Sequence, residues 1–379
     1  MTSTTPSARA PAAPRDRKGL RTGYTTGACA AAAAKAAART LVAGIPSTSI
    51  ESTLPNGQKV IFALSRCERI GDRAVASVIK DAGDDPDCTH GAELVAEVQL
   101  VSALGVVLRG GAGVATVTKP GLGLEVGAPA INPIPRRNIT EMVLEELAGT
   151  KWSGAIVTVS VPGGLEMAKK TTNARLGLLG GISILGTSGI VKPFSTAAYR
   201  ASVVQAIDVA CERGTDELVL TTGGKSELYA MKLHPQLPEE AFIQVGDFVG
   251  TGLRHCARRG VRRVIVVGMI GKLSKMADGK MMTHAAGSEV NMDLLASLAG
   301  ELGGDVTVCE AIRSANTARH VLELCMAAGL AGVTSLVCKR VVEHGRAHAG
   351  GEIDVHAYLV DFDGNTLGQH GPTNVAESP

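Results

Sequence analysis

The stretch Leu218-Val-Leu-Thr-Thr-Gly-Gly-Lys-Ser-Glu227 decides the fold expected for the second half of this chain. An apolar run of strand length passes into two glycines, and Val264-Ile-Val-Val-Gly-Met-Ile-Gly-Lys-Leu273 repeats the pattern. A short apolar run that ends in glycine is typical of a buried parallel strand followed by a tight turn. The two stretches predict a parallel sheet whose ligand lies at the carboxyl ends of its strands.

Strand-like runs alternate with amphipathic segments from about residue 195 onward. Helices are expected over 195–213, 247–259, 288–301 and 316–328. Strands are expected over 217–222, 262–268, 305–310, 332–338 and 355–363, the last as a candidate antiparallel edge strand. This alternation predicts βαβ units, and hence a C-terminal α/β domain over residues 196–379 with a doubly wound, Rossmann-like parallel sheet.

Residues 19–195 lack that alternation. An Ala-rich helix is expected to start at Thr26 and to end before Gly44 and Pro46, and a second over 138–148, capped by Asn138 or Thr140. Strands are expected over 59–65, 74–80, 94–101, 114–119 and 155–161. Strands outnumber helices and Gly-rich loops separate them, which predicts an N-terminal α+β domain. Residues 1–18, rich in proline and poor in apolar residues, are expected to form a disordered tail.

Composition excludes several classes of protein. Of the 379 residues 45% are hydrophobic and 20% charged, which excludes an intrinsically disordered chain. The net charge is only +2, and five basic residues against one acidic residue fall in the first 21, so the body is not a basic nucleic-acid binder. No apolar span suits a membrane helix. Eight cysteines without a CxxC pair predict reduced, mostly buried thiols in a cytoplasmic protein.

Three stretches of the first domain contain candidate site residues. Thr25 and Thr26 precede a helix N-terminus, where they can cap the helix or help to bind an anion. The loop from Lys80 to His90 holds four aspartates within seven residues; a plain turn, a cation-binding loop and a general base all remain open, although the EF-hand spacing is absent. Its candidate catalytic residues are Asp81, Asp85 and His90.

Basic residues among the Gly-rich loops form the third stretch: Arg109, Lys119, Arg136 and Arg137. Arginine binds carboxylates through two parallel hydrogen bonds, so these four are expected to bind an anionic ligand with several carboxylates. Simple surface loops are the alternative.

The candidate cofactor site lies in the second domain. Thr222, Gly223, Gly224, Gly268 and Gly271 follow two predicted strands, where a nucleoside-like cofactor would bind. Glu310 ends a third predicted strand and is expected to bind ribose hydroxyls.

Three histidines are candidate metal ligands: His344, His348 and His356. They have a loose ligand-like spacing, but Gly345, Gly350 and Gly351 argue against a long helix there. Hydrogen-bonded histidines are therefore favoured, and no metal site is predicted.

Several stretches together resemble the CbiD family. They are Thr22-Gly-Tyr-Thr-Thr-Gly-Ala-Cys29, Lys80-Asp-Ala-Gly-Asp-Asp-Pro-Asp87, Lys119-Pro-Gly-Leu122, Pro129-Ala-Ile-Asn-Pro133, Gly180-Gly-Ile-Ser-Ile-Leu-Gly-Thr-Ser-Gly-Ile-Val191 and Gly271-Lys-Leu273. The resemblance implies methylation of C1 of cobalt-precorrin-5B by S-adenosylmethionine, giving cobalt-precorrin-6A in anaerobic cobalamin biosynthesis. It also implies a tetrapyrrole-binding domain over 19–195, an S-adenosylmethionine-binding domain over 196–379, and a small-molecule partner rather than a nucleic acid or a membrane.

Two alternatives remain. One is a nucleotide-dependent enzyme built on the same sheet, although the Walker A and GxGxxG motifs are missing. The other is a non-catalytic carrier of the corrin intermediate. The oligomeric state stays open, with a homodimer as one option.

Overall fold

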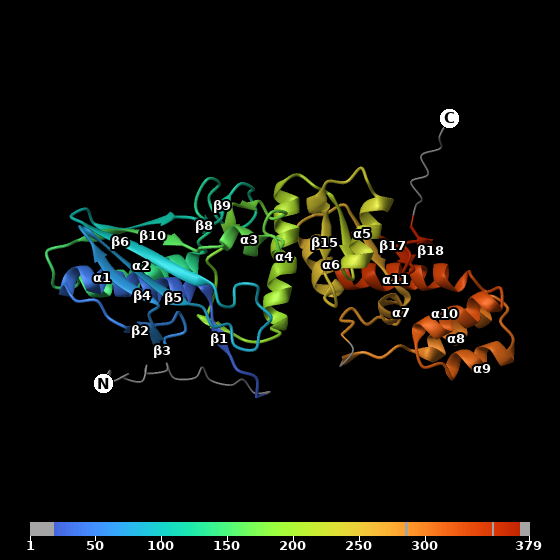
Figure 1. Cartoon of the computed structure of the whole chain (residues 1–379). Coiled ribbons are helices and arrows are strands. Elements are labelled where there is room, and N and C mark those ends of the chain that lie inside the picture. Colours follow the sequence, from blue (N-terminus) through green and yellow to red (C-terminus); the bar gives the residue numbers. More distant parts are fainter. Residues whose placement is uncertain (1–18, 285–286, 351, 372–379) are drawn as a thin grey trace. The chain divides into compact units, whose positions relative to one another are not determined.

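The computed structural model describes residues 19–284, 287–350 and 352–371, which form two compact units (Figure 1). Unit 1 extends to Ser195 and unit 2 begins at Thr196. The division falls where the sequence changes from scattered strands to regular strand–helix alternation. The tail predicted for residues 1–18 lies outside the described residues.

Unit 1 contains short strands and two long helices. Its elements are β1 (Gly23–Tyr24), α1 (Thr26–Ala43), β2 (Ser49–Thr53), β3 (Lys59–Ala63), β4 (Arg66–Ile70), β5 (Arg73–Ile79), β6 (Glu93–Val101), β7 (Gly105–Gly110), β8 (Gly113–Val114), β9 (Thr116–Val117), α2 (Pro133–Leu147), β10 (Gly154–Ser160), α3 (Gly164–Ala168), β11 (Leu178–Leu179), β12 (Gly181–Ile182) and β13 (Ile190–Val191).

A five-stranded sheet of order β4-β5-β6-β10-β7 carries the core of unit 1, and its strands pair antiparallel except β10 with β7. Helices α1 and α2 pack on the same face of this sheet (Figure 1). The alanines of α1 between Ala28 and Ala38 are almost completely buried, because small side chains let the helix approach the sheet closely. The helix begins at Thr26 and ends at Gly44, whose φ of 76° suits glycine, as predicted.

Helix α2 begins earlier than the sequence predicted. It starts at Pro133 after Asn132, so Asn138 and Thr140 lie inside the helix and the predicted caps are wrong. Proline is tolerated at the first helical position because its missing N–H would be unpaired there.

Short strand pairs connect distant parts of unit 1: β1 with β13, β8 with β12, and β9 with β11. The strand predicted over 114–119 is therefore two short pieces in different pairs. Gly113 shows why glycine is required here: its φ is 75°, and a Cβ would overlap the carbonyl oxygen of Val161.

Unit 2 is built around a second five-stranded sheet. Its elements are α4 (Thr196–Glu212), β14 (Glu217–Thr221), α5 (Gly224–Leu233), the 3₁₀ turn η1 (Glu239–Ala241), β15 (Phe242–Gln244), α6 (Val249–Arg258), β16 (Arg263–Gly268), α7 (Ile270–Ala277), α8 (Met292–Glu301), α9 (Val306–Arg313), α10 (Ala318–Ala327), α11 (Val333–Ala349), β17 (Asp354–Val360) and β18 (Thr366–His370).

The sheet order is β15-β14-β16-β17-β18, and every neighbouring pair is parallel except β17 with β18. The parallel sheet predicted for this half is confirmed. The antiparallel edge strand is β18, whereas the predicted edge over 355–363 is β17, which pairs parallel with β16. The order of the strands along the sheet reverses between β14 and β16, where open α/β sheets bind ligands.

Helices pack on both faces of this sheet. A Cβ on Gly345 of α11 would lie 3.3 Å from Val355 and 3.7 Å from Leu253 of α6, so α6 and α11 share one face. His234, which follows α5, packs its ring on Tyr358. Tyr358 and Val355 are three residues apart on β17, so their side chains project from opposite faces.

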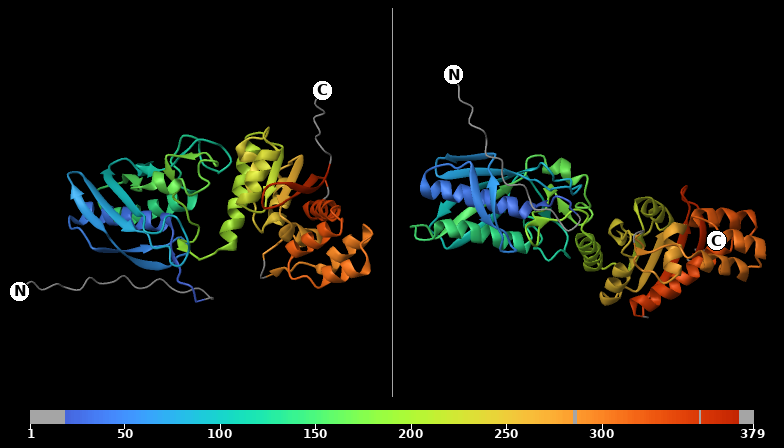
Figure 2. Two further views of the ribbon diagram at one scale, coloured as in Figure 1. Left: turned by 45° about the vertical axis from the view of Figure 1, so that its right-hand side comes forward. Right: turned by 90° about the horizontal axis from the view of Figure 1, so that it is seen from below.

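Two predicted strands of unit 2 are helices. Residues 306–310 belong to α9, whose N-cap Asp305 accepts a hydrogen bond from Val308 N at 2.8 Å, and residues 333–338 begin α11 after its N-cap Gly332. The valines suggested strands, but the buried positions of α11 recur at helical spacing: Val333, Val337, Cys338, Val341 and Val342. The orange helices α8–α10 gather beside the sheet instead of extending it (Figure 2).

Helix α11 also corrects the expectation for the histidines. It extends to Ala349 and includes His344 and His348, while His356 lies on β17. Gly345 does not break the helix because it allows close packing on β17, and the helix ends at Gly350, whose φ is 108°.

The cysteines have the state that the sequence predicted, reduced and mostly buried. All eight cysteines are free and five are buried, as predicted. Burial raises the pKa of Cys29 to about 12, so this thiol stays protonated and inert. Among the described residues, no helix is long and apolar enough to cross a membrane.

Candidate functional site

A cavity of about 760 Å³ opens in unit 2 where the strand order reverses. Three groups of residues line most of it: those after β14, those after β16, and those at the start of α10. They include Thr222, Gly223, Lys225, Ser226, Met269, Ile270, Gly271, Lys272, Lys275, Asn316, Thr317, Ala318 and Arg319, together with Asp247 and Phe362. The two glycine-ended strands therefore meet at one cavity, as their pattern predicted.

Gly223 and Gly271 leave the cavity open at the ends of β14 and β16. A Cβ on either glycine would meet no atom within 4 Å. The backbone at Gly223 is extended, with φ of 170°, so any residue could adopt it. The backbone conformation of the protein therefore does not require glycine at this position.

The other predicted cofactor residues are placed differently. A Cβ on Gly268 would overlap Leu273, so this glycine serves packing at the end of β16. Gly224 is the first residue of α5 and lies outside the cavity lining. Glu310 is exposed on α9, also outside the lining, because the strand predicted to present it is a helix.

Asp247 is the carboxylate of this cavity, and sequence reasoning missed it. Its Oδ1 lies 3.0 Å from Lys272 Nζ and accepts a hydrogen bond of 3.0 Å from Thr283 Oγ1. Burial alone would raise the pKa of Asp247, but Lys272 and Thr283 together hold it below its ordinary value. Lys272 also donates to Thr222 O at 2.8 Å. Asp247 is thus ionised, and within the described parts of the chain its Oδ2 has no hydrogen-bond partner.

Helix starts and cations give the cavity its electrostatic character. Helices α5, α7 and α10 begin at its wall, capped by Gly223, Met269 and Thr317. Unpaired N–H groups and the helix dipole favour negative charge at such positions. The Phe362 ring lies 5.7 Å from Lys225 Nζ and 5.6 Å from the Arg319 guanidinium carbon. The arrangement suits a ligand with an anionic group and an apolar or aromatic part.

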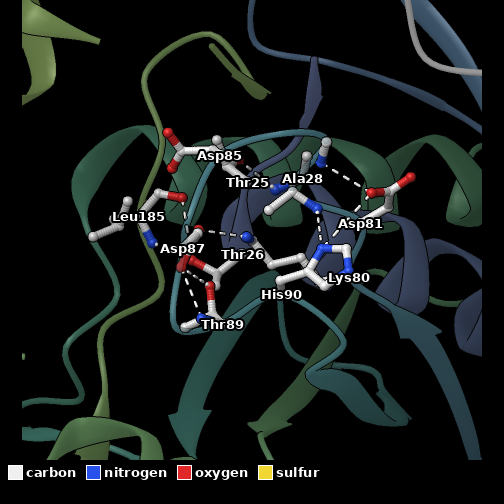
Figure 3. A network of polar contacts seen from close by, with 12 residues as sticks. Thr25, Thr26, Ala28, Lys80, Asp81, Asp85, Asp87, Thr89, His90 and Leu185 are labelled. Carbon is white, nitrogen blue, oxygen red and sulfur yellow. Dashed lines mark hydrogen bonds and ion pairs between the residues drawn. The ribbon is translucent and has the colours of Figure 1, made fainter. Parts of the chain in front are cut away.

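In unit 1, residues of the acidic loop 80–91 lie beside the start of α1 (Figure 3). Tyr24 N donates to Asp81 O at 2.7 Å, and Asp84 N donates to Arg21 O at 2.9 Å. Phe194 N donates to Asp85 Oδ1 at 2.9 Å. The loop therefore holds the start of α1 and the segment after β13 in place.

Buried Lys80 and half-buried Asp87 form an ion pair at the base of this loop. The Lys80 side chain is 1% exposed, and its Nζ lies 2.6 Å from Asp87 Oδ2. Asp87 Oδ1 accepts hydrogen bonds from Thr89 N at 2.8 Å and from Thr89 Oγ1 at 2.6 Å. Within the described ranges, no three His, Cys, Asp or Glu side chains group as a metal site would require.

The three predicted catalytic residues differ in whether a side-chain atom is still available to accept a proton. Asp81 is ion-paired with Arg21 and accepts from Gly83 N; burial alone would raise its pKa, but these contacts lower it. His90 Nδ1 accepts from Ala82 N at 3.1 Å, so the proton of the neutral ring is assigned to Nε2, which can only donate. Asp85 keeps a second carboxylate oxygen without a partner in the described structure.

Thr25 and Thr26 use their hydroxyl groups within the protein. Thr25 Oγ1 caps α1 by accepting from Ala28 N at 3.2 Å, and Thr26 Oγ1 accepts from Leu185 N at 2.9 Å. Both residues are buried. The sequence left helix capping and anion binding open for these two threonines, and these contacts favour helix capping.

The structure does not bring the four predicted carboxylate-binding cations together. Leu108 of β7 packs in the core with α2, so the next side chain, Arg109, projects from the opposite face of the sheet. Arg136 and Arg137 lie on α2, and Arg137 is 3.8 Å from Glu141. Lys119 donates to the carbonyl of Arg175 at 3.2 Å.

Comparisons with known proteins match most of the chain. Residues 13–193 match the family model described as CbiD, and residues 282–371 match the model described as CbiD, C-terminal domain. A relative from Leptospira borgpetersenii is 59% identical over 352 residues, which are 93% of this chain and 95% of the relative. Relatives from Rubrobacter xylanophilus and Salinispora tropica are 55% and 50% identical; the matches cover 92% and 96% of this chain and 90% and 97% of the relatives.

All three relatives are named cobalt-precorrin-5B C(1)-methyltransferase. A crystal structure of the cobalamin biosynthesis protein CbiD from Archaeoglobus fulgidus is 25% identical, covers 82% of this chain and 85% of its own, and has a TM-score of 0.37.

Proposed function

This chain belongs to the CbiD family, and from that premise we propose that it transfers a methyl group to C1 of cobalt-precorrin-5B. The observation that carries the proposal is 59% identity over 93% of the chain to a relative named for this reaction. The cobalt ion arrives within the substrate. A methyl transfer needs a methyl donor. The residues that line the cavity of unit 2 support S-adenosylmethionine as that donor.

The cavity residues fit this donor in three respects. Gly223 and Gly271 leave space beside the strand ends. The free carboxylate oxygen of Asp247 can accept hydrogen bonds from ribose hydroxyls, and the starts of α5 and α7 offer N–H groups to the carboxylate of the donor. When bound, the sulfonium supplies an activated methyl group.

The protein's task in such a reaction is mainly alignment. Displacement at a methyl carbon is in line, and positioning alone can contribute about 7–11 kcal/mol to lowering the barrier. Asp247 and the strand-end loops would hold the donor, while the walls of the cavity exclude water. No strong acid or base is needed at the methyl carbon.

The proton lost from the substrate requires an acceptor, and we place Asp85 in that role. It is the predicted catalytic residue with a free carboxylate oxygen, whereas Asp81 is paired and His90 is a donor. This assigns the proton acceptor to unit 1 and donor binding to unit 2.

The direct test is catalysis by the purified protein. With S-adenosylmethionine and cobalt-precorrin-5B we expect S-adenosylhomocysteine and a tetrapyrrole heavier by one methylene, detected by mass spectrometry. A carrier would bind the tetrapyrrole without forming either product. A nucleotide-dependent enzyme would bind ATP or NAD in calorimetry, and would bind S-adenosylmethionine no better.

Gly223→Val should block donor binding without unfolding the protein. The backbone accepts valine and a Cβ meets open space, so the branched side chain would take volume from the cavity. We expect the Kd of S-adenosylhomocysteine in calorimetry to rise at least about tenfold, with Tm unchanged. Gly224→Val is the matched control, because Gly224 lies beside the cavity but outside its lining. Equal binding by both variants would place the donor elsewhere.

Asp85→Asn should slow turnover more than it weakens substrate binding. The amide oxygen can still accept from Phe194 N, so the loop keeps its shape while the base is lost. A general base contributes about 10²–10⁴-fold, and we expect kcat to fall within that range with KM nearly unchanged. Asp84→Asn, a neighbouring exposed aspartate, is the control. Equal kcat values for the two variants would remove Asp85 from the mechanism.

A further inference from the structure

The cavity of unit 2 carries more positive charge than its own carboxylate can balance. Four cations line it, Lys225, Lys272, Lys275 and Arg319, against the single carboxylate of Asp247. Asp247 already pairs with Lys272. The other three cations therefore set the charge that a ligand meets.

Each of these three cations lacks a buried acidic partner in the described structure. Lys275 Nζ donates to the carbonyl oxygen of Thr283 at 3.1 Å, which leaves its charge unbalanced. Lys225 Nζ lies over the face of the Phe362 ring. Arg319 pairs with Glu323 at 3.0 Å, but both side chains are more than half exposed, so solvent screens this pair strongly.

The donor alone does not neutralise the positive charge of the cavity. S-Adenosylmethionine has one carboxylate, one ammonium and one sulfonium, so it carries a net positive charge into a cavity that is already positive. Like charges repel, and solvent screens this repulsion least at half-buried Lys275 and most at exposed Lys225 and Arg319. A second, anionic occupant would remove it.

We infer that Lys225 and Lys275, with Arg319, bind carboxylates of the methyl acceptor, so that this cavity holds the donor and an anionic edge of the acceptor together. The inference rests on the proposed function. It fits the dispersal of the predicted carboxylate-binding cations of unit 1, where Arg109 and α2 lie on opposite faces of a sheet. The volume of about 760 Å³ lies in the upper part of the range for sites that enclose one drug-sized ligand.

Shared electrostatics makes the two binding events cooperative. Acceptor carboxylates neutralise the lysines and so strengthen the binding of the cationic donor. By thermodynamic linkage, the donor strengthens acceptor binding by the same factor. The product S-adenosylhomocysteine has lost the sulfonium charge, so its affinity should depend much less on the acceptor.

The test compares Lys225→Met and Lys275→Met, singly and together, by calorimetry with three probes: S-adenosylmethionine, S-adenosylhomocysteine and uroporphyrin as a tetrapyrrole polycarboxylate. In the double variant we expect S-adenosylmethionine to bind about three- to tenfold more tightly and S-adenosylhomocysteine to change less than twofold. Uroporphyrin should bind at least tenfold more weakly. Uroporphyrin should also tighten S-adenosylmethionine binding to the unmodified protein, and this effect should disappear in the double variant.

Lys232→Met is the matched control. Lys232 also lies on α5 with its Nζ over an aromatic ring, that of Tyr229 at 6.0 Å, but outside the cavity lining. It removes the same charge and should leave all three affinities unchanged.

Two results would overturn the inference. One is weaker binding of S-adenosylmethionine and S-adenosylhomocysteine alike in the lysine variants, which would mean that the lysines bind the donor's own carboxylate. The other is uroporphyrin binding that does not depend on the lysines. Failure of the proposed donor site looks different: neither donor probe binds the unmodified protein, while the lysine dependence of uroporphyrin binding remains.

Discussion

Asp87→Ala is expected to lower the free energy of unfolding by about 3–5 kcal/mol, because it leaves the Lys80 ammonium buried without a counter-charge. Lys80 is 1% exposed, and its Nζ lies 2.6 Å from Asp87 Oδ2. The variant also removes the acceptor for Thr89 N and Thr89 Oγ1. Urea unfolding at neutral pH measures the effect directly.

Two further variants separate the ion pair from ordinary loop damage. Combining Asp87→Ala with Lys80→Met should recover much of the lost stability, since replacing both partners of a buried pair is often nearly neutral. Asp84→Ala, in the same loop but exposed, should cost far less. A loss no larger for Asp87→Ala than for Asp84→Ala would show that the buried charge does not matter.

The pair also predicts how stability depends on pH. Burial alone would raise the pKa of Asp87, but Lys80 and Thr89 lower it below its ordinary value. A carboxyl whose pKa is lowered by folding stabilises the protein above its unfolded pKa, near 4. That stabilisation is lost as pH falls through the lowered, folded-state pKa. Unfolding curves at acid pH should therefore be less pH-dependent for Asp87→Ala than for the unmodified protein.

Gly83→Ala should lower the free energy of unfolding by about 3 kcal/mol, because two energetic penalties add at this position. Its φ is 70°, a left-handed backbone that costs a residue with a Cβ about 1–2 kcal/mol. The Cβ would also overlap the carbonyl oxygen of Arg21, and relieving such overpacking typically costs about 1–3 kcal/mol. The backbone of residues 21–24 would have to move away from the loop.

Gly91→Ala supplies the matched comparison within the same loop. Gly91 has nearly the same φ, 76°, but a Cβ there would meet nothing within 4 Å. It should therefore cost about 1–2 kcal/mol, the backbone penalty alone. The difference in urea midpoints between the two variants measures the close approach of the loop to Arg21. Equal midpoints would mean that this approach adds nothing to stability.

The sequence was informative where one local signal controls the outcome. The alanine run with Gly44 defined α1, and the two Val-rich runs ending in glycine located β14, β16 and the cavity between them. The prediction of strands was wrong where it relied on valine content instead of periodicity, as in residues 305–310 and 332–338. There the i, i+4 spacing of buried residues was the better indicator.

Other features depend on contacts that no local pattern contains. Asp247 follows β15, a strand of three residues that was not predicted, so its place at the cavity could not be foreseen. Arg109 and Arg136 looked like one cluster because the loops around them are similar. Only the pairing of β7 in the sheet shows that Arg109 projects away from α2.

The position of β17 has a consequence for how the protein is made. This strand comes late in the chain but lies next to β16 inside the sheet, and the segment after it contributes Phe362 to the cavity wall. On the ribosome, unit 1 is fully synthesised long before this strand emerges, and domains generally fold in that order. A premature stop codon before residue 354 would thus yield a protein with a fully synthesised first unit and an incomplete cavity in the second.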